Sequence, residues 1–301
     1  MQIQVRRLAE NSHCALNPSF DSERARLTAI IGGRASVRIS GPASAVWIPL
    51  HGPICVSTRD AEYVMQPGEL AVTDADTWTC ATAGRGDIWI GLAAEPGAWS
   101  RFLQNCPRSV IADPTLLPER HGASPELRRQ ADRLAQASSE GAAEAAVHAL
   151  IESIVELQNP MAAMIARCPG RTYRRRLRTF LSLQRVRRYM ASNCHREIDT
   201  AMLAKLAHYS PAWFIRVFHK TYVETPHAFL TNQRMLRAHE LVRGSELAIA
   251  EIAQATGFGD RSSFSRLFRR RFGVPAAVVR RWRDRQAPDV RDGAWEGANP
   301  A

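Results

Sequence analysis

The chain has 301 residues, of which 45% are apolar and 23% charged, and its net charge is +11. This composition is typical of globular proteins and excludes wholesale disorder, and the length is enough for two domains. There is no membrane-length apolar run, no apolar stretch of a secretory signal, and no CxxC pair among six scattered cysteines. We therefore expect a soluble cytoplasmic protein without a zinc finger or a disulfide framework.

Residues 25–95 are rich in β-branched and aromatic side chains, interrupted by turn dipeptides such as Gly41-Pro42 and Pro67-Gly68. Many short strands at this spacing favour an antiparallel sandwich or barrel. The predicted strands are Ala35–Ser40, Ala45–Leu50, Pro53–Thr58, Tyr63–Gln66, Glu69–Thr73, Thr77–Ala83 and Asp87–Ala93.

Helical periodicity replaces this pattern after residue 95. Helices are predicted at Pro125–Ser138 and Ala142–Gln158, and the second carries an apolar stripe of Val147, Leu150, Ile151, Ile154 and Leu157. Pro169-Gly170 and the arginines after it predict a linker, and helix is expected from there to about residue 285.

The positive charge lies entirely in the second part of the chain. Residues 1–170 contain 15 Lys and Arg against 18 Asp and Glu, whereas residues 171–301 contain 25 against 11. A compositional bias of the genome explains why arginine outnumbers lysine, but it does not explain this asymmetry. The asymmetry indicates a polyanionic partner, most simply nucleic acid.

The basic part contains an internal repeat. Leu203–Tyr209 aligns with Ile252–Phe258 at a lag of 49 residues, and Phe214–Phe218 aligns with Phe264–Phe268 at a lag of 50. Each copy predicts a helix, a tight turn and a second helix that packs through its aromatic residues. The sequence therefore predicts two helix-turn-helix motifs.

The turn and the cap of each copy are set by a few residues. Gly257 is suited to a turn that needs positive φ, and His208 is a less favourable occupant of the same place. Ser210 is the expected N-cap of the second helix in the first copy. In the second copy either Asp260 or Ser262 can take that role.

The second helix of each copy leaves one polar face outward. Since a major groove admits one helix and arginine bonds guanine bidentately, Arg216 and Arg266, at equivalent positions, are predicted to read bases. Lys220, Arg269, Arg270 and Arg271 lie further along and are expected at phosphates. The alternative is that these side chains only solvate a helical repeat. The full outward set is Ala212, Trp213, Arg216 and Lys220 in the first copy and Arg261, Ser262, Ser265, Arg266 and Arg269 in the second.

A long helix is predicted between the copies, from Thr225-Pro226 to Gly244. Its expected buried stripe is Phe229, Leu230, Met235, Leu236, Leu241 and Val242. A rigid connection fixes the distance between the two outward faces. Reading neighbouring major grooves on one side of DNA requires about 34 Å, one turn of the duplex.

The pattern Ile252-Ala253-x3-Gly257-Phe258-x3-Ser262-x-Phe264-x-Arg266-x-Phe268-Arg269-x3-Gly273 resembles the second helix-turn-helix of AraC/XylS-type bacterial transcription regulators. Ser210-Pro211, Phe218 and Thr225-Pro226-x2-Phe229-Leu230 resemble the first copy and the connecting helix. The resemblance covers about residues 180–285. It departs at His208, where the family has glycine, and at Pro275-Ala276 and Val279, where the family has Ser/Thr-Pro followed by a tyrosine.

The resemblance implies a sequence-specific transcriptional activator that binds promoter DNA as a homodimer, together with RNA polymerase, in the cytoplasm at the nucleoid. It implies base contacts at Ala212, Ile215 and Arg216 and at Arg261, Ser262, Ser265 and Arg266. A nonspecific architectural DNA-binding protein is the alternative. An enzyme is not expected, since the sequence has no GxSxG, HExxH or Walker A pattern.

The helices predicted within Pro125–Gln158 resemble the dimerisation helices of that family; the alternative interpretation is that their apolar stripe packs on the β-rich region. The N-terminal part is more loosely similar to the cupin-like sensor domains of that family. Gln66-Pro67-Gly68-Glu69, followed by Trp78, is similar to a strand turn of such a barrel. Metal-binding cupins need His-x-His and a Glu, whereas His51 stands alone, so no metal and no cofactor is predicted. A small-molecule effector site is one interpretation of five residues that plain core packing also explains: Arg38, Trp47, His51, Trp78 and Trp89.

The predicted organisation has four parts. Residues 1–165 form a cupin-like antiparallel β-barrel with appended helices, which regulates the protein and mediates dimerisation. Residues 166–176 form a linker, and residues 177–286 form an all-α domain with two helix-turn-helix motifs joined by a long helix. Residues 287–301 form a disordered tail.

Overall fold

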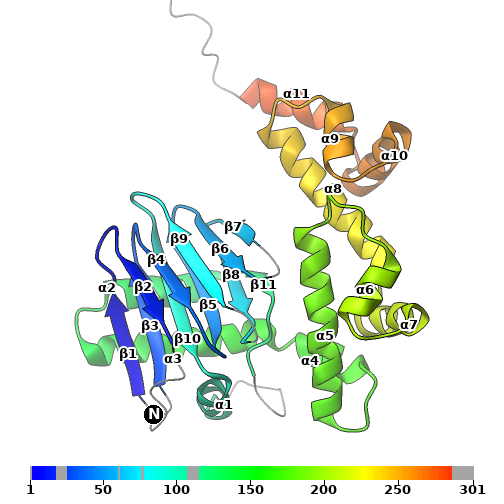
Figure 1. Cartoon of the computed structure of the whole chain (residues 1–301). Helices are drawn as coiled ribbons and strands as arrows, with labels where there is room; N and C mark the ends of the chain where they lie inside the picture. The colour runs from blue at the N-terminus through cyan, green and yellow to red at the C-terminus, as the bar shows by residue number, and fades with distance from the viewer. Residues whose placement is uncertain (1, 18–25, 60–61, 76–77, 107–114, 287–301) are drawn as a thin grey trace, which may run out of the picture. The chain divides into compact units, whose positions relative to one another are not determined.

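The computed structural model describes residues 2–17, 26–59, 62–75, 78–106 and 115–286 (Figure 1). The chain divides into two compact units. The first comprises residues 1–192 and 200–225, and the second comprises residues 193–199 and 226–301. The first copy of the repeat therefore belongs to the same unit as the strands. The predicted tail at 287–301 lies outside the described residues.

The strands of the first unit form two sheets, and all seven predicted strands are found within two residues of their expected ends. The six-stranded sheet has the order β1 (Gln2–Arg7), β3 (Arg26–Gly32), β10 (Ile88–Ala94), β5 (Ser44–His51), β8 (Glu69–Thr73) and β11 (Arg120–Gly122). The five-stranded sheet has the order β2 (His13–Leu16), β4 (Ser36–Ile39), β9 (Thr79–Ala83), β6 (Ile54–Thr58) and β7 (Glu62–Met65).

Neighbouring strands pair antiparallel, except that β1 and β2 pair parallel to β3 and β4. Among the described residues these pairings make two open sheets and do not close into a barrel. The expected cupin-like barrel is therefore not confirmed, whereas the sheet-rich N-terminal region is.

The two sheets pack face to face because each strand alternates between buried and exposed side chains. In β4, for example, Val37 and Ile39 are buried between the sheets and Arg38, between them in sequence, is exposed. The turn predicted at Pro67-Gly68 joins β7 to β8. Gly68 has a φ of +97°, and the Glu69 side chain accepts a hydrogen bond from the Gln66 amide at 2.8 Å.

Three helices cover the other face of the six-stranded sheet: α1 (Pro96–Gln104), α2 (Pro125–Gln136) and α3 (Glu140–Gln158). The predicted stripe of α3 packs into this core. Val147, Leu150, Ile151 and Ile154 are buried among residues of the sheet and of α2, and Leu157 packs against them. The second interpretation of the stripe is therefore confirmed, and the stripe gives no support to a dimer.

The remaining helices belong to the basic part. In the first unit these are α4 (Met161–Arg167), α5 (Tyr173–Ser192), α6 (Thr200–Leu206) and α7 (Pro211–Tyr222). In the second unit they are α8 (Pro226–Gly244), α9 (Ile249–Ala255), α10 (Arg261–Phe272) and α11 (Ala276–Gln286). Helix α5 starts inside the expected linker, so the arginines from Arg174 to Arg178 are helical. No helix in the described ranges is long and apolar enough to cross a membrane.

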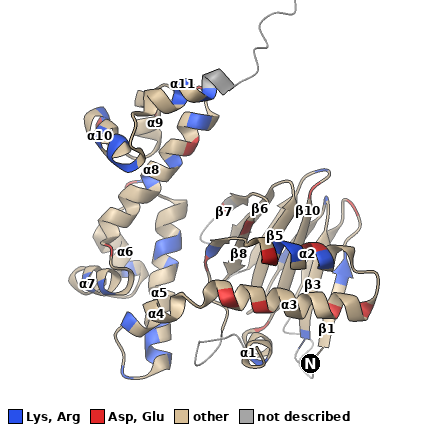
Figure 2. Ribbon diagram, turned by 180° about the vertical axis from the view of Figure 1, so that it is seen from behind, with Lys and Arg blue, Asp and Glu red and all other residues tan. Residues whose placement is uncertain are grey.

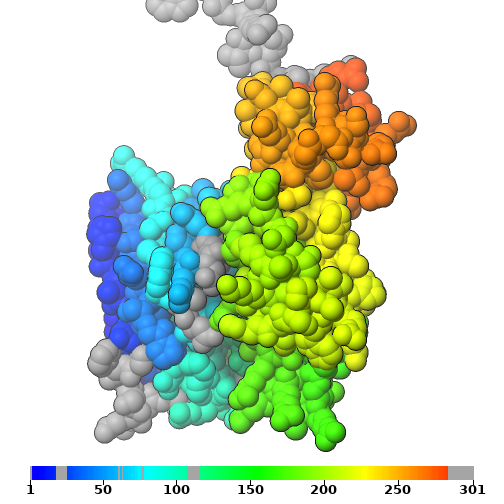
Figure 3. Space-filling view, turned by 45° about the vertical axis from the view of Figure 1, so that its right-hand side comes forward, coloured from blue at the N-terminus to red at the C-terminus, as the bar shows by residue number. Residues whose placement is uncertain are grey.

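Helix α5 is fixed to the sheet region inside the first unit. Arg188 of α5 forms an ion pair with Asp74, just after β8, at 3.2 Å, and Arg187 pairs with Glu119, just before β11, at 3.5 Å. In Figure 3 the green surface that includes α5 lies beside the cyan strands, in agreement with these ion pairs. The first helix-turn-helix copy and the sheets thus share one packed unit.

Candidate nucleic-acid interface

The first helix-turn-helix copy consists of α6, a tight turn and α7. Ala204 is almost fully buried where α6 and α7 approach, as the small side chain allows. His208 occupies the turn with a φ of +59°, in the left-handed region predicted for it. Ser210 caps α7 by accepting a hydrogen bond from the amide of Trp213 at 3.4 Å, with Pro211 in the first turn.

Helix α7 separates its aromatic core from a polar and apolar outer face. Phe214 and Phe218 are fully buried and pack edge to face, with ring centroids 5.6 Å apart. The predicted contact residues are all exposed: Ala212, Trp213, Ile215, Arg216 and Lys220. The Arg216 guanidinium lies 5.5 Å from the centre of the Trp213 ring, which holds the arginine along the exposed face.

The second copy repeats this construction in α9 and α10. Gly257 has a φ of +84°, and a Cβ at this position would lie 3.0 Å from the Arg234 guanidinium. Of the two predicted caps it is Asp260 that accepts the Ser263 amide, at 2.7 Å. Hydrogen bonds from the backbone and side chain of Ser263 lower the pKa of Asp260. Helix α10 thus begins as the sequence predicts, with the ambiguity between Asp260 and Ser262 resolved.

Helix α10 has the more basic outer face. Phe264 and Phe268 are fully buried, while the predicted contacts Arg261, Ser262, Ser265, Arg266 and Arg269 are exposed. Figure 2 shows the resulting group of positive residues on α10. A hollow of about 340 Å³ on this helix is lined by Ser263, Arg266, Leu267 and Arg270. Two exposed guanidiniums beside a hydroxyl suit phosphate and base edges.

The arginine run at the end of α10 serves two purposes. Arg270 is exposed and lies beside Arg266 in this hollow, which leaves it available for the phosphate contact predicted for it. Arg271 donates instead to Asn232 of α8 at 2.9 Å, which is a structural role. The sequence signal for Arg270 was the run itself, but periodicity alone does not separate its members.

The two predicted base-reading arginines, Arg216 and Arg266, lie in different compact units. Both are exposed on the helix that follows the turn of their copy, as expected. The 34 Å separation stays a prediction. The helix predicted to join the copies is α8, in which Phe229, Leu230, Met235 and Val242 are buried as expected, whereas Leu236 is exposed.

A chain of polar contacts holds the C-terminal end of α7. The Tyr222 hydroxyl donates to Gln184 of α5 at 2.9 Å, and the Gln184 amide donates to Glu119 at 2.7 Å. Burial raises the pKa of Tyr222 well above its ordinary value, so the phenol stays protonated. Arg167 of α4 donates to the carbonyl of Thr221 at 2.9 Å. We call these contacts of Thr221 and Tyr222 the anchor of α7. The sequence alone does not reveal the anchor, because its members are far apart in sequence.

The five residues predicted for an effector site do not line one cavity. Trp47 and Trp89 are fully buried between the sheets, with ring centroids 5.7 Å apart. Arg38 and His51 are exposed, and Trp78 is more than one-third exposed, with the Arg38 guanidinium 5.0 Å from the Trp78 ring centre. Alternation along the strands explains the split, because Arg38 faces away from the core that the two buried indoles fill.

Glycines opposite the buried indoles make their packing possible. Gly91 lies opposite Trp47, and a Cβ there would lie 2.9 Å from the indole; at Gly32, opposite Trp89, it would lie 2.4 Å away. The Trp89 Nε1 donates to the carbonyl of Gly33 at 3.0 Å. The two tryptophans therefore act as core residues, which was the alternative interpretation.

A family model and several curated proteins are similar to this chain. Residues 203–281 match a family model described as a helix-turn-helix domain. The chain is 25% identical over 262 residues to the HTH-type transcriptional regulator ExsA of Pseudomonas aeruginosa, which spans 79% of this chain and 86% of that protein. It is 42% identical over 60 residues to the HTH-type transcriptional activator RhaS of Salmonella arizonae, or 20% of this chain and 22% of RhaS.

Solved structures are similar to about one-third of the chain. The DNA-binding domain of AdpA, in complex with a target DNA, is 29% identical with a TM-score of 0.33, covering 35% of this chain and 96% of that chain. A transcriptional regulator of Chromobacterium violaceum with an AraC-type DNA-binding domain is 23% identical with a TM-score of 0.33, covering 35% and 94%. The matched homologues are named as regulators of transcription.

Proposed function

We propose that this protein, which carries an AraC-type helix-turn-helix domain at residues 203–281 and has AraC-family regulators among its homologues, is a sequence-specific DNA-binding regulator of transcription. The supporting observation is the pair of exposed faces on α7 and α10. Each follows a left-handed turn and presents an arginine, Arg216 or Arg266, at the same place in its copy.

The residues divide by the chemistry they offer to DNA. Arg216 and Arg266 read bases in the major groove, where a guanidinium bonds guanine O6 and N7. Ser262 and Ser265 are short polar neighbours that fit base edges, and Ala212 and Ile215 offer apolar contact to a thymine methyl. Lys220, Arg269 and Arg270 bind phosphates, which makes affinity fall as salt rises.

The N-terminal region controls the first copy in this proposal. Two hydrogen bonds, from Tyr222 to Gln184 and from Gln184 to Glu119, support this control, because they link the end of α7 to the segment just before β11. A small molecule or partner that shifts β11 changes the anchor of this helix. The proposed domains keep their expected bounds: residues 1–165 for regulation and residues 177–286 for DNA.

Activation of transcription at promoters, together with RNA polymerase, is the proposed outcome, and the name of RhaS as a transcriptional activator supports it. The competing function is nonspecific architectural binding. Two helix-turn-helix copies with arginines at matching positions favour sequence-specific binding, because backbone neutralisation alone needs no such repetition.

Selection from a pool of random duplex oligonucleotides with the full-length protein separates these functions. We expect enrichment of one asymmetric motif, because the two outer faces differ in sequence. The Arg101→Ala variant removes one exposed charge from α1, which belongs to neither copy, and is expected to enrich the same motif. Binding of the pool without enrichment of any motif would show an architectural protein instead.

A further inference from the structure

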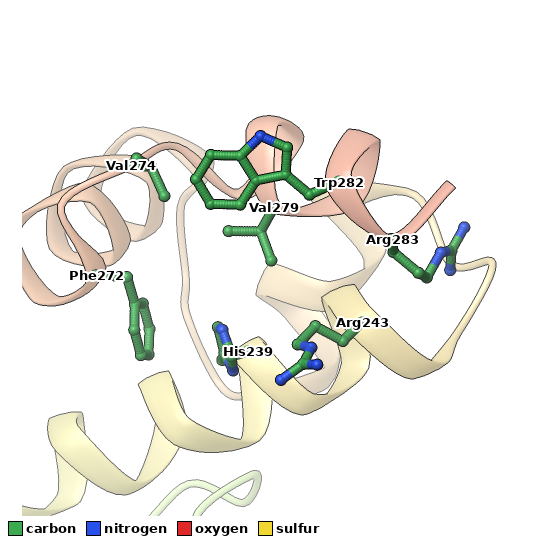
Figure 4. A pocket seen from close by; sticks show the side chains of 7 residues that line it. All are labelled: His239, Arg243, Phe272, Val274, Val279, Trp282 and Arg283. Carbon is green, nitrogen blue, oxygen red and sulfur yellow. The ribbon is translucent and has the colours of Figure 1, made fainter. Parts of the chain in front are cut away.

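A cavity of about 550 Å³ lies within the second unit, between α8 and the segment that joins α10 to α11 (Figure 4). Its volume is in the range of small-molecule sites. None of the predicted DNA contacts lines it. The lining residues are His239 and Arg243 from α8, Phe272 and Val274 from the end of α10 and the turn after it, and Val279, Trp282 and Arg283 from α11.

The side chains that line this cavity leave apolar surface uncovered. Val279 stands where the AraC pattern has a tyrosine, so this position fills less space than the pattern provides for. Trp282, above it in Figure 4, remains 50% exposed, which is unusual for so large an apolar surface. A flat apolar ligand body would bury this indole and Phe272 together.

The cavity has a cationic side. In Figure 4, Arg243 and Arg283 lie at one end and Phe272 and Val274 at the other. Arg283 donates to the carbonyl of Ser245 at 2.7 Å and pairs with Glu246 at 3.1 Å. Arg243 is exposed, and no carboxylate of the described residues pairs with it. Arg243 is therefore available for an anionic group.

The imidazole of His239 lies between the two ends. It stacks on Phe272 with ring centroids 4.6 Å apart and 25° between the planes. Burial and the charge of Arg243 lower the pKa of His239, so the ring is neutral at pH 7. A neutral, stacked imidazole extends the aromatic wall and also offers a hydrogen bond.

We infer that this cavity binds an aromatic carboxylate, with the ring against Phe272 and Trp282 and the carboxylate on the guanidinium of Arg243. Guanidinium and carboxylate form paired hydrogen bonds, which makes this end selective for planar anions. Because the walls come from α8, α10 and α11, the ligand stabilises the packing of the second helix-turn-helix copy. The site is distinct from the DNA-contact faces and does not depend on their assignment.

Isothermal titration of the full-length protein with a naphthalene carboxylate, without DNA, tests this inference. We expect one bound molecule per chain and at least tenfold weaker binding of the corresponding naphthalene alcohol. Arg243→Ala is expected to weaken binding of the carboxylate at least tenfold. Arg237→Ala, on an exposed part of the same helix and outside the cavity, is the matched control and is expected to bind normally.

Val279→Tyr supplies a second, independent variant. Val279 lines the cavity, so the larger tyrosine side chain should fill part of it, and we expect this variant to fold, to bind DNA and to lose the carboxylate. The inference is wrong if the carboxylate does not bind, if the alcohol binds equally well, or if both cavity variants bind like the wild type. Displacement by inorganic phosphate at equal concentration would also overturn it, since the site would then be a simple anion site.

Discussion

The last residues of α7 form hydrogen bonds with other helices of the first unit, whereas the last residue of α10 lines an open cavity. In the first copy Thr221 and Tyr222 contact α4 and α5, and through Gln184 they reach Glu119 at the sheet edge. In the second copy Phe272 and the turn after it line the cavity next to α8 and α11. The two copies share turn, cap and aromatic core, but they differ in what surrounds them.

The difference shows that a sequence repeat need not be a repeat of environment. The turn and the buried phenylalanines come from residues within each copy, so both copies form them. The surroundings come from residues far away in sequence, so they diverge. One copy is joined to the N-terminal region, and the other depends on packing within a small helical unit.

The largest expected effect is on stability, and it tests whether the two units unfold separately. Phe214→Ala and Phe264→Ala remove equivalent, fully buried rings, and each should destabilise its own unit by about 3–5 kcal/mol. Hydrogen exchange in dilute urea measures both units at once. Phe264→Ala should speed exchange in α8 to α11 and leave β5 and β10 unchanged. Equally faster exchange in β10 would show that the units unfold together.

The turns of the two copies should respond in opposite directions. Gly257→Ala places a Cβ at positive φ beside Arg234, and we expect a loss of about 1–2 kcal/mol in the free energy of unfolding. His208→Gly removes the steric cost of a non-glycine residue in the left-handed region, and the free energy of unfolding should rise by up to about 1 kcal/mol. Urea denaturation measures both. A change of the same sign in both variants would contradict the equivalence of the turns.

The anchor of α7 gives a smaller effect. Tyr222→Phe removes the donor to Gln184 and should cost about 0.5–1.5 kcal/mol of stability in the first unit. Tyr209→Phe, in the turn of the same copy, is the control and should cost less. Urea denaturation of both variants provides the comparison, and equal losses would contradict the anchor.

The pH dependence of Tyr222 follows from its raised pKa. A pKa that is higher in the folded state than in the unfolded one stabilises the protein below the ordinary tyrosine value of about 10. This contribution is lost as the pH rises through the folded pKa. Tyr222→Phe should therefore lose part of the alkaline sensitivity of the wild type.

Local patterns predicted the helix-turn-helix copies well, because turn, cap and core lie within about 20 residues of one another in each copy. The left-handed φ of His208 and Gly257 and the caps of α7 and α10 are confirmed. Strands with clear alternation were also predicted. Pairing between strands was not, because a single sequence carries no register, and this is why two open sheets replaced the expected barrel.

Contacts between residues far apart in the chain could not be predicted from the sequence. The anchor joins Glu119 to Gln184 and Tyr222, and the cavity joins His239 to Trp282. The departure at Val279 was visible as a missing tyrosine, but only the structure places it in a cavity wall. The five residues predicted for an effector site are divided between core and surface for another reason: aromatic residues in strands suit a ligand site and a core equally well.

Base preference in Arg216→Ala and Arg266→Ala tests the central claim most directly. Selection with each full-length variant, followed by affinity measurements on the selected and on random duplexes, compares them with Arg101→Ala. We expect each to lose about 1–3 kcal/mol on the selected site and little on random DNA. Each should relax preference at its own position, with the two about one duplex turn apart. Equal losses on selected and random DNA would contradict base reading by these helices.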